Sequence, residues 1–310
     1  MLQGEKAEGK ADRPAGRGFS VDGARFAADS LEPGLYVVAT PIGHLEDITL
    51  RALKTLAGVD RIVCEDTRIT RRLTGRYGIT TPLTAYHDHN AERVRPRLLA
   101  ELAAGASIAL VSDAGTPLVS DPGYRLVEAA IKADIPVVAC PGPSALLASL
   151  VVAGLPSDAF CFLGFLPPKS AQRRRKLAVY AELPASLVVY EARSRIAATL
   201  ADMIAVFGPD CRAVLARELT KAFETVRRGT LAELADQVAA KPPRGEIVVL
   251  VGPRAAGPGL SDAEIDGMIR QGLAAATPVK AIAAEIAERS GQSRRAIYAR
   301  VLALRDGQAG

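Results

Sequence analysis

Alternation of short apolar runs with helical patterns is the feature that most constrains how this chain can fold. Residues 35–39 (LYVVA) are typical of a buried strand, and residues 47–56 carry apolar side chains at helical spacing. The alternation continues with expected strands at 61–64, 107–111 and 136–139. Strands that alternate with helices predict βαβ units, and therefore a parallel sheet covered by helices on both faces, which we assign to residues 34–155.

A second α/β domain is expected over residues 156–253. Its predicted strands at 213–217 and 224–227 are separated by too few residues for a crossover helix, so this domain should contain an antiparallel hairpin within a mixed sheet. The Pro-punctuated, basic segment 164–175 (GFLPPKSAQRRR) is expected to be the junction between the two domains.

Both ends of the chain differ in composition from these domains. Residues 1–33 lack an apolar signal core, and acids balance bases among the first thirty, so we expect a mobile tail rather than a targeting sequence. Residues 252–259 are rich in Gly and Pro and are expected to be a linker. Residues 261–305 contain short helical patterns around a Gly-containing turn, which predicts a small domain resembling a helix-turn-helix. A packed helical appendage is the alternative.

Composition excludes several classes of protein. No run among the 310 residues approaches the roughly 18 to 20 apolar residues of a membrane helix. The four cysteines show no CxxC spacing and the three histidines no HExxH motif, so we expect neither disulfides nor a metal site, in a cytoplasmic protein. The formal net charge of +5 is compatible with a polyanionic partner, although many metabolic enzymes have a similar charge.

Three loops rich in Gly, Pro, Ser and Thr follow predicted strands of the first domain. They lie at residues 40–44 (TPIGH), 112–117 (SDAGTP) and 141–145 (PGPSA). Open α/β sheets bind ligands at the carboxyl ends of their strands, and small residues let a ligand approach the backbone closely. Because the chain has neither a GxxxxGK[ST] motif nor a GxGxxG motif after its first strand, a nucleoside-like ligand is favoured. Each loop taken alone could be an ordinary turn.

Several longer motifs occur together along the chain: GLYVVATPIGHLEDITLRAL, CEDTR, SDAGTPLVSDPG, PGPSA, GFLPPK, YEARSRI, RELTK, RGTL and GEIVVLVG. In their order and spacing, Gly34 to Gly252 resembles the tetrapyrrole-methylase superfamily. Within it, the chain is similar to the bacterial methyltransferases that modify a ribose 2′-hydroxyl of small-subunit ribosomal RNA. The C-terminal helices resemble the small extra domain of that family.

The resemblance implies two α/β domains with S-adenosylmethionine in the cleft between them, and usually a homodimer. The implied activity is 2′-O-methylation of a cytidine in the decoding centre of 16S rRNA, with the 30S subunit as partner. Carried over to this sequence, the implied cofactor-binding residues are Pro41, Ser112, Asp113, Ala114, Gly115, Thr116, Ser144, Ala145, Tyr190 and Leu219. The chain departs from the family at His44, where Asn is common, at Arg193 and Ser194, in place of Pro-His, and at Phe223, in place of His.

Methyl transfer to a hydroxyl requires alignment and a group that takes up the proton. Glu65, Asp66 and Lys221 are the candidate catalytic residues. Asp66 could instead cap the helix that follows it or pair with Arg68. Glu191 is expected to form an ion pair rather than to act as a base.

Three basic clusters are candidates for binding the phosphates of RNA. They are Arg68, Arg71 and Arg72, then Lys169, Arg173 and Arg174, and finally Arg294 and Arg295. A solvated surface is the alternative for each cluster.

Two other functions remain open from the sequence. A C-methyltransferase acting on a tetrapyrrole would use the same fold, and the many carboxylates of such a substrate would also suit basic patches. A catalytically silent RNA-binding assembly factor would keep the basic clusters but would not need intact cofactor loops. The appended helical domain and the CEDTR motif favour an RNA substrate.

Overall fold

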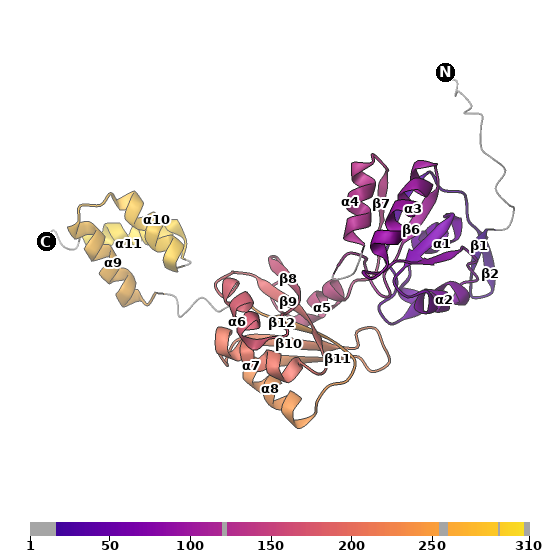
Figure 1. Ribbon diagram of the computed structural model, residues 1–310. Coiled ribbons are helices and arrows are strands. Elements are labelled where there is room, and N and C mark those ends of the chain that lie inside the picture. The colour runs from indigo at the N-terminus through magenta and orange to yellow at the C-terminus, as the bar shows by residue number, and fades with distance from the viewer. Residues whose placement is uncertain (1–16, 120–122, 254–259, 291, 307–310) are drawn as a thin grey trace, which may run out of the picture. The chain divides into compact units, whose positions relative to one another are not determined.

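The computed structural model describes residues 17–119, 123–253, 260–290 and 292–306 (Figure 1). The chain divides into two compact units, residues 1–253 and 254–310. Within the described parts, the first unit holds two five-stranded sheets and a two-stranded hairpin, and the second holds helices only. The predicted fold class, two α/β sheets followed by a small helical domain, is confirmed.

The first sheet is parallel throughout, as the alternating pattern predicted. Its strands lie in the order β5–β4–β6–β3–β7. Their bounds are Gly34–Val38 for β3, Arg61–Cys64 for β4, Leu83–Ala85 for β5, Ser107–Leu110 for β6 and Val137–Cys140 for β7. Strand β3 lies between β6 and β7 and pairs with both, with Leu35 opposite Ile108 on one side and Val137 on the other.

Helices cover both faces of this sheet. Side chains of α1 (Leu50–Gly58) and α2 (Thr67–Arg76) form one core with Val38, and those of α3 (Ala91–Ala103) and α4 (Tyr124–Lys132) form another with Leu35. Alternate residues of β3 therefore serve opposite faces. The neighbouring strands β3 and β6 lead into helices on opposite faces, which makes their carboxyl ends the switch point where α/β sheets bind ligands.

The second sheet is mixed, with the order β11–β10–β12–β9–β8. Its strands are β8 (Phe160–Phe165), β9 (Ser186–Ala192), β10 (Arg212–Arg217), β11 (Thr225–Thr230) and β12 (Glu246–Val251). Only β8 and β9 are parallel among these pairs, and β10 and β11 form the antiparallel hairpin that the short connection predicted.

One face of the second sheet is covered by three helices and the other by a single helix from the preceding domain. The three are α6 (Ser170–Val179), α7 (Ile196–Phe207) and α8 (Leu231–Ala240), which line one side of the sheet in Figure 1. On the other face, Val188, Val214 and Leu250 pack with Leu150 of α5 (Ala145–Ala153). This shared apolar layer joins the helix that follows β7 to the second sheet.

The expectation of a mobile tail over residues 1–33 is wrong for residues 17–33, and residues 1–16 lie outside the described residues. Strands β1 (Gly18–Val21) and β2 (Ala24–Ala27) form a hairpin against the first domain. Phe19 is 1% exposed within the core of α1 and β4, and Arg17 pairs with Asp60 at 3.2 Å. The charge balance of this segment gave no sign of its structure, because the order of the segment depends on one large apolar side chain, Phe19, that packs into a core formed by residues distant in sequence.

The expectation of a domain junction at residues 164–175 is also wrong. Strand β8 occupies the start of this segment and α6 most of the rest, with Pro167 and Pro168 between them. Gly164 has φ +61° at a register shift in the pairing of β8 with β9, an irregularity that weakens the strand signal in the sequence.

The C-terminal unit consists, in its described residues, of α9 (Asp262–Ala274), α10 (Val279–Ser290) and α11 (Arg294–Asp306). Ser261 and Glu264 form a reciprocal capping box at the start of α9. The core is made of aliphatic side chains from all three helices, including Ile265, Ile282 and Ile297. This unit therefore has a core of its own. In the described part of the chain, no helix has the length and apolar character needed to span a bilayer.

The hairpin provides a test of the revised N-terminal boundary. Phe19→Ala should lower the free energy of unfolding by about 3–5 kcal/mol, because it leaves a cavity in a closed core. Phe26→Ala is the matched control, since Phe26 stacks on Phe19 from the other strand but is 44% exposed. Urea unfolding of both variants checks the prediction, and an equal, small loss in both would contradict it.

Candidate functional site

Hydrogen bonds join the three loops at the carboxyl edge of the parallel sheet. The backbone N–H of Thr40 donates to the Gly115 carbonyl at 2.9 Å, and the N–H of Gly115 donates to the Thr40 carbonyl at 3.0 Å. The Thr116 hydroxyl donates to the Pro143 carbonyl at 3.0 Å. The loops after β3, β6 and β7 therefore form one framework, which we call the loop framework (residues 40–44, 112–117 and 141–145).

Small and short polar residues set the shape of the loop framework. The buried Ser112 hydroxyl donates to the Ala114 carbonyl at 3.1 Å and so fixes the turn that follows β6. Gly115 has φ +81°, a conformation that L side chains rarely adopt, and an added Cβ would lie 3.2 Å from Cγ2 of Ile42. Glycine at position 115 is thus favoured both by the positive φ of the backbone and by the short distance to Ile42.

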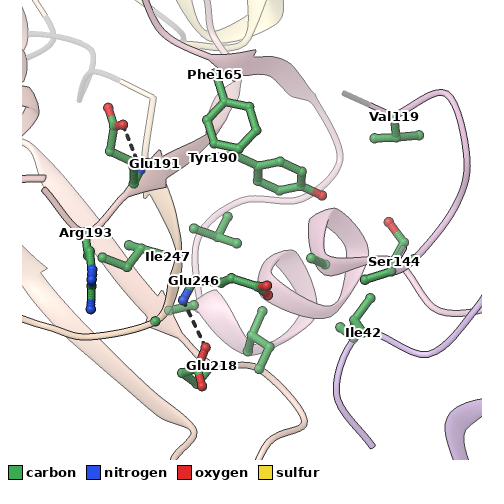
Figure 2. A pocket seen from close by; sticks show the side chains of 18 of the residues that line it. Ile42, Val119, Ser144, Phe165, Tyr190, Glu191, Arg193, Glu218, Glu246 and Ile247 are labelled. Atoms are coloured by element: carbon green, nitrogen blue, oxygen red, sulfur yellow. Dashed lines mark hydrogen bonds between the residues drawn. The ribbon is translucent and has the colours of Figure 1, made fainter. Parts of the chain in front are cut away.

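A cavity of about 540 Å³ lies between the loop framework and the second sheet (Figure 2). From the first domain it is lined by Ile42, Ala114, Gly115, Thr116, Val119, Ser144 and Ala145. From the second domain the lining includes Phe165, Tyr190, Glu191, Arg193, Glu218, Leu219 and Glu246. Its volume is in the range of small-molecule sites, and most of its lining side chains are apolar or very small.

The connection between β10 and β11 meets the first loop closely. The backbone N–H of His44 donates to the Thr220 hydroxyl at 3.0 Å. A Cβ on Gly43 would lie 2.7 Å from that same hydroxyl oxygen, so this approach requires a glycine. Glu218 and Thr220 have φ of +52° and +64°, which marks the connection as a tightly constrained turn.

Two carboxylates and one ammonium group form a cluster at the second-domain wall of the cavity. Lys221 Nζ lies 3.0 Å from Glu218 Oε1 and 3.1 Å from Glu246 Oε2. The Glu246 backbone N–H and the Lys221 ammonium both lower the pKa of Glu218. Burial alone would lower the pKa of Lys221, but hydrogen bonds to the two carboxylates raise it overall. Lys221 therefore carries its proton at neutral pH, which makes it unsuited to act as a base.

Glu191 is held by the fold. Its side chain is buried, accepts a hydrogen bond from the Thr199 hydroxyl at 2.5 Å and pairs with Arg195 at 3.2 Å. The predicted ion pair of Glu191 is confirmed, with Arg195 as the partner.

A second group of carboxylates lies at the ends of β4 and β6. Asp66 caps α2 by accepting from the Arg68 backbone N–H at 2.8 Å and pairs with the Arg68 guanidinium at 2.6 Å. These hydrogen bonds lower the pKa of Asp66 to about 2. Asp113 accepts from the Asp66 backbone N–H at 2.9 Å. Burial, followed by the charges of Asp113 and Asp88, raises the pKa of Glu65.

Comparison with known proteins identifies this architecture. The family model for tetrapyrrole (corrin/porphyrin) methylases matches residues 34–235, and the model for the RsmI C-terminal HTH domain matches residues 260–305. Ribosomal RNA small subunit methyltransferase I of Mesorhizobium japonicum is 53% identical over 280 residues, covering 90% of this chain and 95% of its own. The Pseudomonas aeruginosa protein of the same name is 48% identical, covering 86% and 96%. The chain belongs to the ribosomal RNA small subunit methyltransferase I family, within the tetrapyrrole methylases.

Solved structures share the fold of this family member. The methyltransferase CobJ superposes with a TM-score of 0.56 over 72% of this chain and 95% of its own, at 22% identity. Uroporphyrin-III C-methyltransferase of Thermus thermophilus, complexed with S-adenyl homocysteine, gives 0.53 over 71% and 97%, at 21% identity. At such identities the likeness extends to the fold alone.

The structure brings most of the predicted cofactor residues of this methyltransferase family member to one cavity. Its lining includes seven of the ten, namely Ala114, Gly115, Thr116, Ser144, Ala145, Tyr190 and Leu219. Pro41, Ser112 and Asp113 belong to the loop framework, and none of the three is in the described cavity lining. Ser120, Asp121 and Pro122, the end of the SDAGTPLVSDPG motif, lie outside the described residues.

Sequence reasoning missed several lining residues of the second domain. Phe165 lies at the end of the unrecognised strand β8, and Glu218 and Glu246 lie in the RELTK and GEIVVLVG motifs, of which only Leu219 was assigned to the cofactor. Arg193 was noted only as a departure from the family pattern. The antiparallel pairing of β10 with β12, which brings Glu218 beside Glu246, is a contact that no local pattern could have indicated.

The basic clusters differ in exposure. Arg71 and Arg72 are exposed on α2, as is Arg68, which pairs with Asp66. Lys169 and Arg174 are exposed at the start of α6, and Arg294 and Arg295 are exposed on α11 in the other unit. These positions remain candidates for binding RNA.

The prediction that Arg173 binds RNA is wrong. Its side chain is 3% exposed, and its guanidinium lies 2.6 Å from the equally buried carboxylate of Asp202. It also donates to the Pro168 carbonyl at 3.2 Å, so it fixes the start of α6 on α7. The helical period turns this one arginine of the basic run toward the core.

Substitution can separate this structural role from RNA binding. Arg173→Ala should lower the free energy of unfolding by about 3 kcal/mol, because it removes the buried partner of Asp202 and leaves that carboxylate an ion pair only with the exposed Arg174. Arg175→Ala, two residues along on the exposed surface of α6, should change it by less than about 0.5 kcal/mol. Chemical denaturation of both variants is the measurement, and a stable Arg173→Ala protein would contradict the assignment.

Proposed function

We propose that this protein transfers the methyl group of S-adenosylmethionine to the ribose 2′-hydroxyl of a cytidine in the decoding centre of 16S rRNA. The observation that carries the proposal is identity of 45–53%, over 85–90% of this chain, to proteins named ribosomal RNA small subunit methyltransferase I. The match of residues 260–305 to the RsmI C-terminal HTH domain supports an RNA substrate as well.

The residues around the cavity fit the proposed cofactor. Ala114, Gly115 and Ala145 leave the backbone of the loop framework open to a flat nucleoside, and Thr116 and Ser144 add short polar groups. Glu218 and Glu246 place negative charge on the opposite wall, which suits a cationic ligand. When bound, S-adenosylmethionine supplies a methyl group activated by the positive charge on its sulfur.

The remaining chemistry falls to the side chains of this protein. In-line displacement needs the acceptor oxygen about 3 Å from the reacting carbon, so a rigid loop framework contributes by fixing that approach. Of the two candidate carboxylates at the end of β4, neither of which is in the described cavity lining, we propose Glu65 as the base, because its raised pKa makes it a stronger proton acceptor than Asp66, whose pKa is about 2. Lys221 keeps its proton and contributes positive charge beside the cavity.

The exposed arginines of α2 and the bases at the start of α6 are proposed to bind RNA phosphates, together with Arg294 and Arg295. A homodimer acting on the 30S subunit in the cytoplasm completes the proposal. A tetrapyrrole C-methyltransferase is supported by the family model over residues 34–235 and by the shared fold at 15–22% identity, whereas the relatives at 45–53% identity are named as rRNA methyltransferases.

Mapping of ribose methylation tests the proposed reaction. Small-subunit rRNA from cells lacking this protein should lose one 2′-O-methyl group on a cytidine in the decoding region, and expression of the wild-type chain should restore it. Mass spectrometry of nuclease fragments detects the change of one methyl group. Identical methylation of rRNA with and without the protein would exclude the proposed reaction.

The role of Glu65 predicts a pH dependence. Glu65 must be deprotonated to accept a proton, so activity should fall as pH falls through its raised pKa. Asp88→Asn removes a negative charge that raises this pKa, and should therefore move the acid limb of the kcat profile to lower pH. Asp236→Asn, an exposed change on α8, should leave the limb in place.

Glu65→Gln completes this test. It should lower kcat by about 10²–10⁴-fold and abolish the acid limb. A Glu65→Gln enzyme with normal kcat would remove Glu65 from the mechanism.

A further inference from the structure

Phe165 is an aromatic residue whose side chain is exposed to solvent. It is the last residue of β8, it lines the cavity, and it is 54% exposed. An exposed aromatic ring contributes little to folding by burial, and what distinguishes this one from the other exposed apolar side chains is its place in the lining of a cavity of small-molecule size.

The ring belongs to a small aromatic group on the second-domain wall. Tyr190 lies between Phe162 and Phe165, with ring centroids 4.8 and 5.8 Å away and interplanar angles of 66° and 69°. Both contacts are edge-to-face, so neither phenylalanine is stacked in parallel on the tyrosine. Figure 2 shows Phe165 and Tyr190 on one side of the cavity and Ser144 and Val119 on the other. Because Tyr190 is half-buried and Phe165 is exposed, Phe165 is the more accessible of the two rings.

An exposed cation lines the cavity together with two rings of this aromatic group. Arg193 lines the cavity from the end of β9 and is exposed. Lys169, four residues beyond Phe165 in the sequence, is exposed just before α6, and Arg174 on α6 is exposed and pairs with Asp202. A flat apolar surface in a cavity that an exposed arginine also lines matches the chemistry of a nucleotide, with a planar base and an anionic phosphate.

We propose that Phe165 is the platform on which the base of the acceptor nucleotide stacks while its ribose enters the cavity. The inference rests on the proposed function and adds to it a residue that selects the substrate. The methyl donor fits the loop framework across the cavity, whereas the acceptor must arrive from solvent, past the exposed ring. A nucleotide whose ribose enters the cavity leaves the stack of its neighbours, and an aromatic face replaces the stacking energy that is lost.

Steady-state kinetics with 30S subunits from cells lacking the protein test this inference. Phe165→Ala should raise KM for the RNA substrate by about 5- to 100-fold, the usual range for loss of one base stack, with a dissociation constant for S-adenosylmethionine within twofold of wild type. Phe165→Leu keeps an apolar side chain but no flat face and should behave like Phe165→Ala. Phe165→Trp should restore the wild-type KM.

Phe160→Ala is the matched control, because Phe160 lies on the same strand and is 42% exposed but is not in the described cavity lining. It should leave KM unchanged. Calorimetric binding of S-adenosylmethionine reports whether each variant is folded and whether the cofactor site is intact.

Three outcomes would overturn the inference, and each differs from failure of the proposed function. If Phe165→Leu raises the dissociation constant for S-adenosylmethionine as much as KM for RNA, the ring contributes to cofactor binding. If it changes neither, the ring is not part of substrate recognition. If Phe165→Trp fails to restore KM while the protein stays folded, stacking is not the interaction. Absence of methyl transfer by the wild-type protein would instead refute the proposed function itself.

Discussion

The pair of backbone hydrogen bonds between Thr40 and Gly115 is the interaction on which the rest of the site depends. It joins loops that leave neighbouring strands toward opposite faces of the sheet, and the Thr40 hydroxyl reinforces it by donating to the Ser112 carbonyl at 3.3 Å. Backbone groups that pair here are also withdrawn from solvent, so the loops gain stability without bulky side chains. The loops can therefore be built from small residues, and the space that larger side chains would fill is left to the cavity.

The second domain meets this framework through equally local constraints. Gly43 has no Cβ where the Thr220 hydroxyl approaches, and His44 donates its backbone N–H to that same oxygen. The apolar layer between α5 and the second sheet supports the same arrangement. The cavity wall is thus positioned by packing and backbone bonding together, which suits a reaction that depends on alignment more than on covalent catalysis.

Local pattern predicted the parts of the fold whose structure is determined locally. Strands such as β3 and β6 are visible in the sequence as short apolar runs, and the loops after them as clusters of small residues. The family resemblance added the cofactor positions Tyr190 and Leu219. The hairpin around Phe19 and the burial of Arg173 escaped prediction because each depends on a distant partner, the core of α1 and the carboxylate of Asp202. A charge pattern shows that a residue is basic, but not which way a helix turns it.

The distribution of charge around the cavity suits the proposed reaction. Glu218 and Glu246 line the cavity, where their two carboxylates share one ammonium group, that of Lys221, and the exposed arginines of α2 lie outside the cavity lining described here. Were this reversed, RNA phosphates would compete with the donor for one site. Under the proposed function, RNA phosphates would be held by the exposed arginines and kept away from the two carboxylates. What enters the cavity is then the least charged part of the nucleotide, its sugar and base, and an exposed aromatic ring is the side chain suited to receive it.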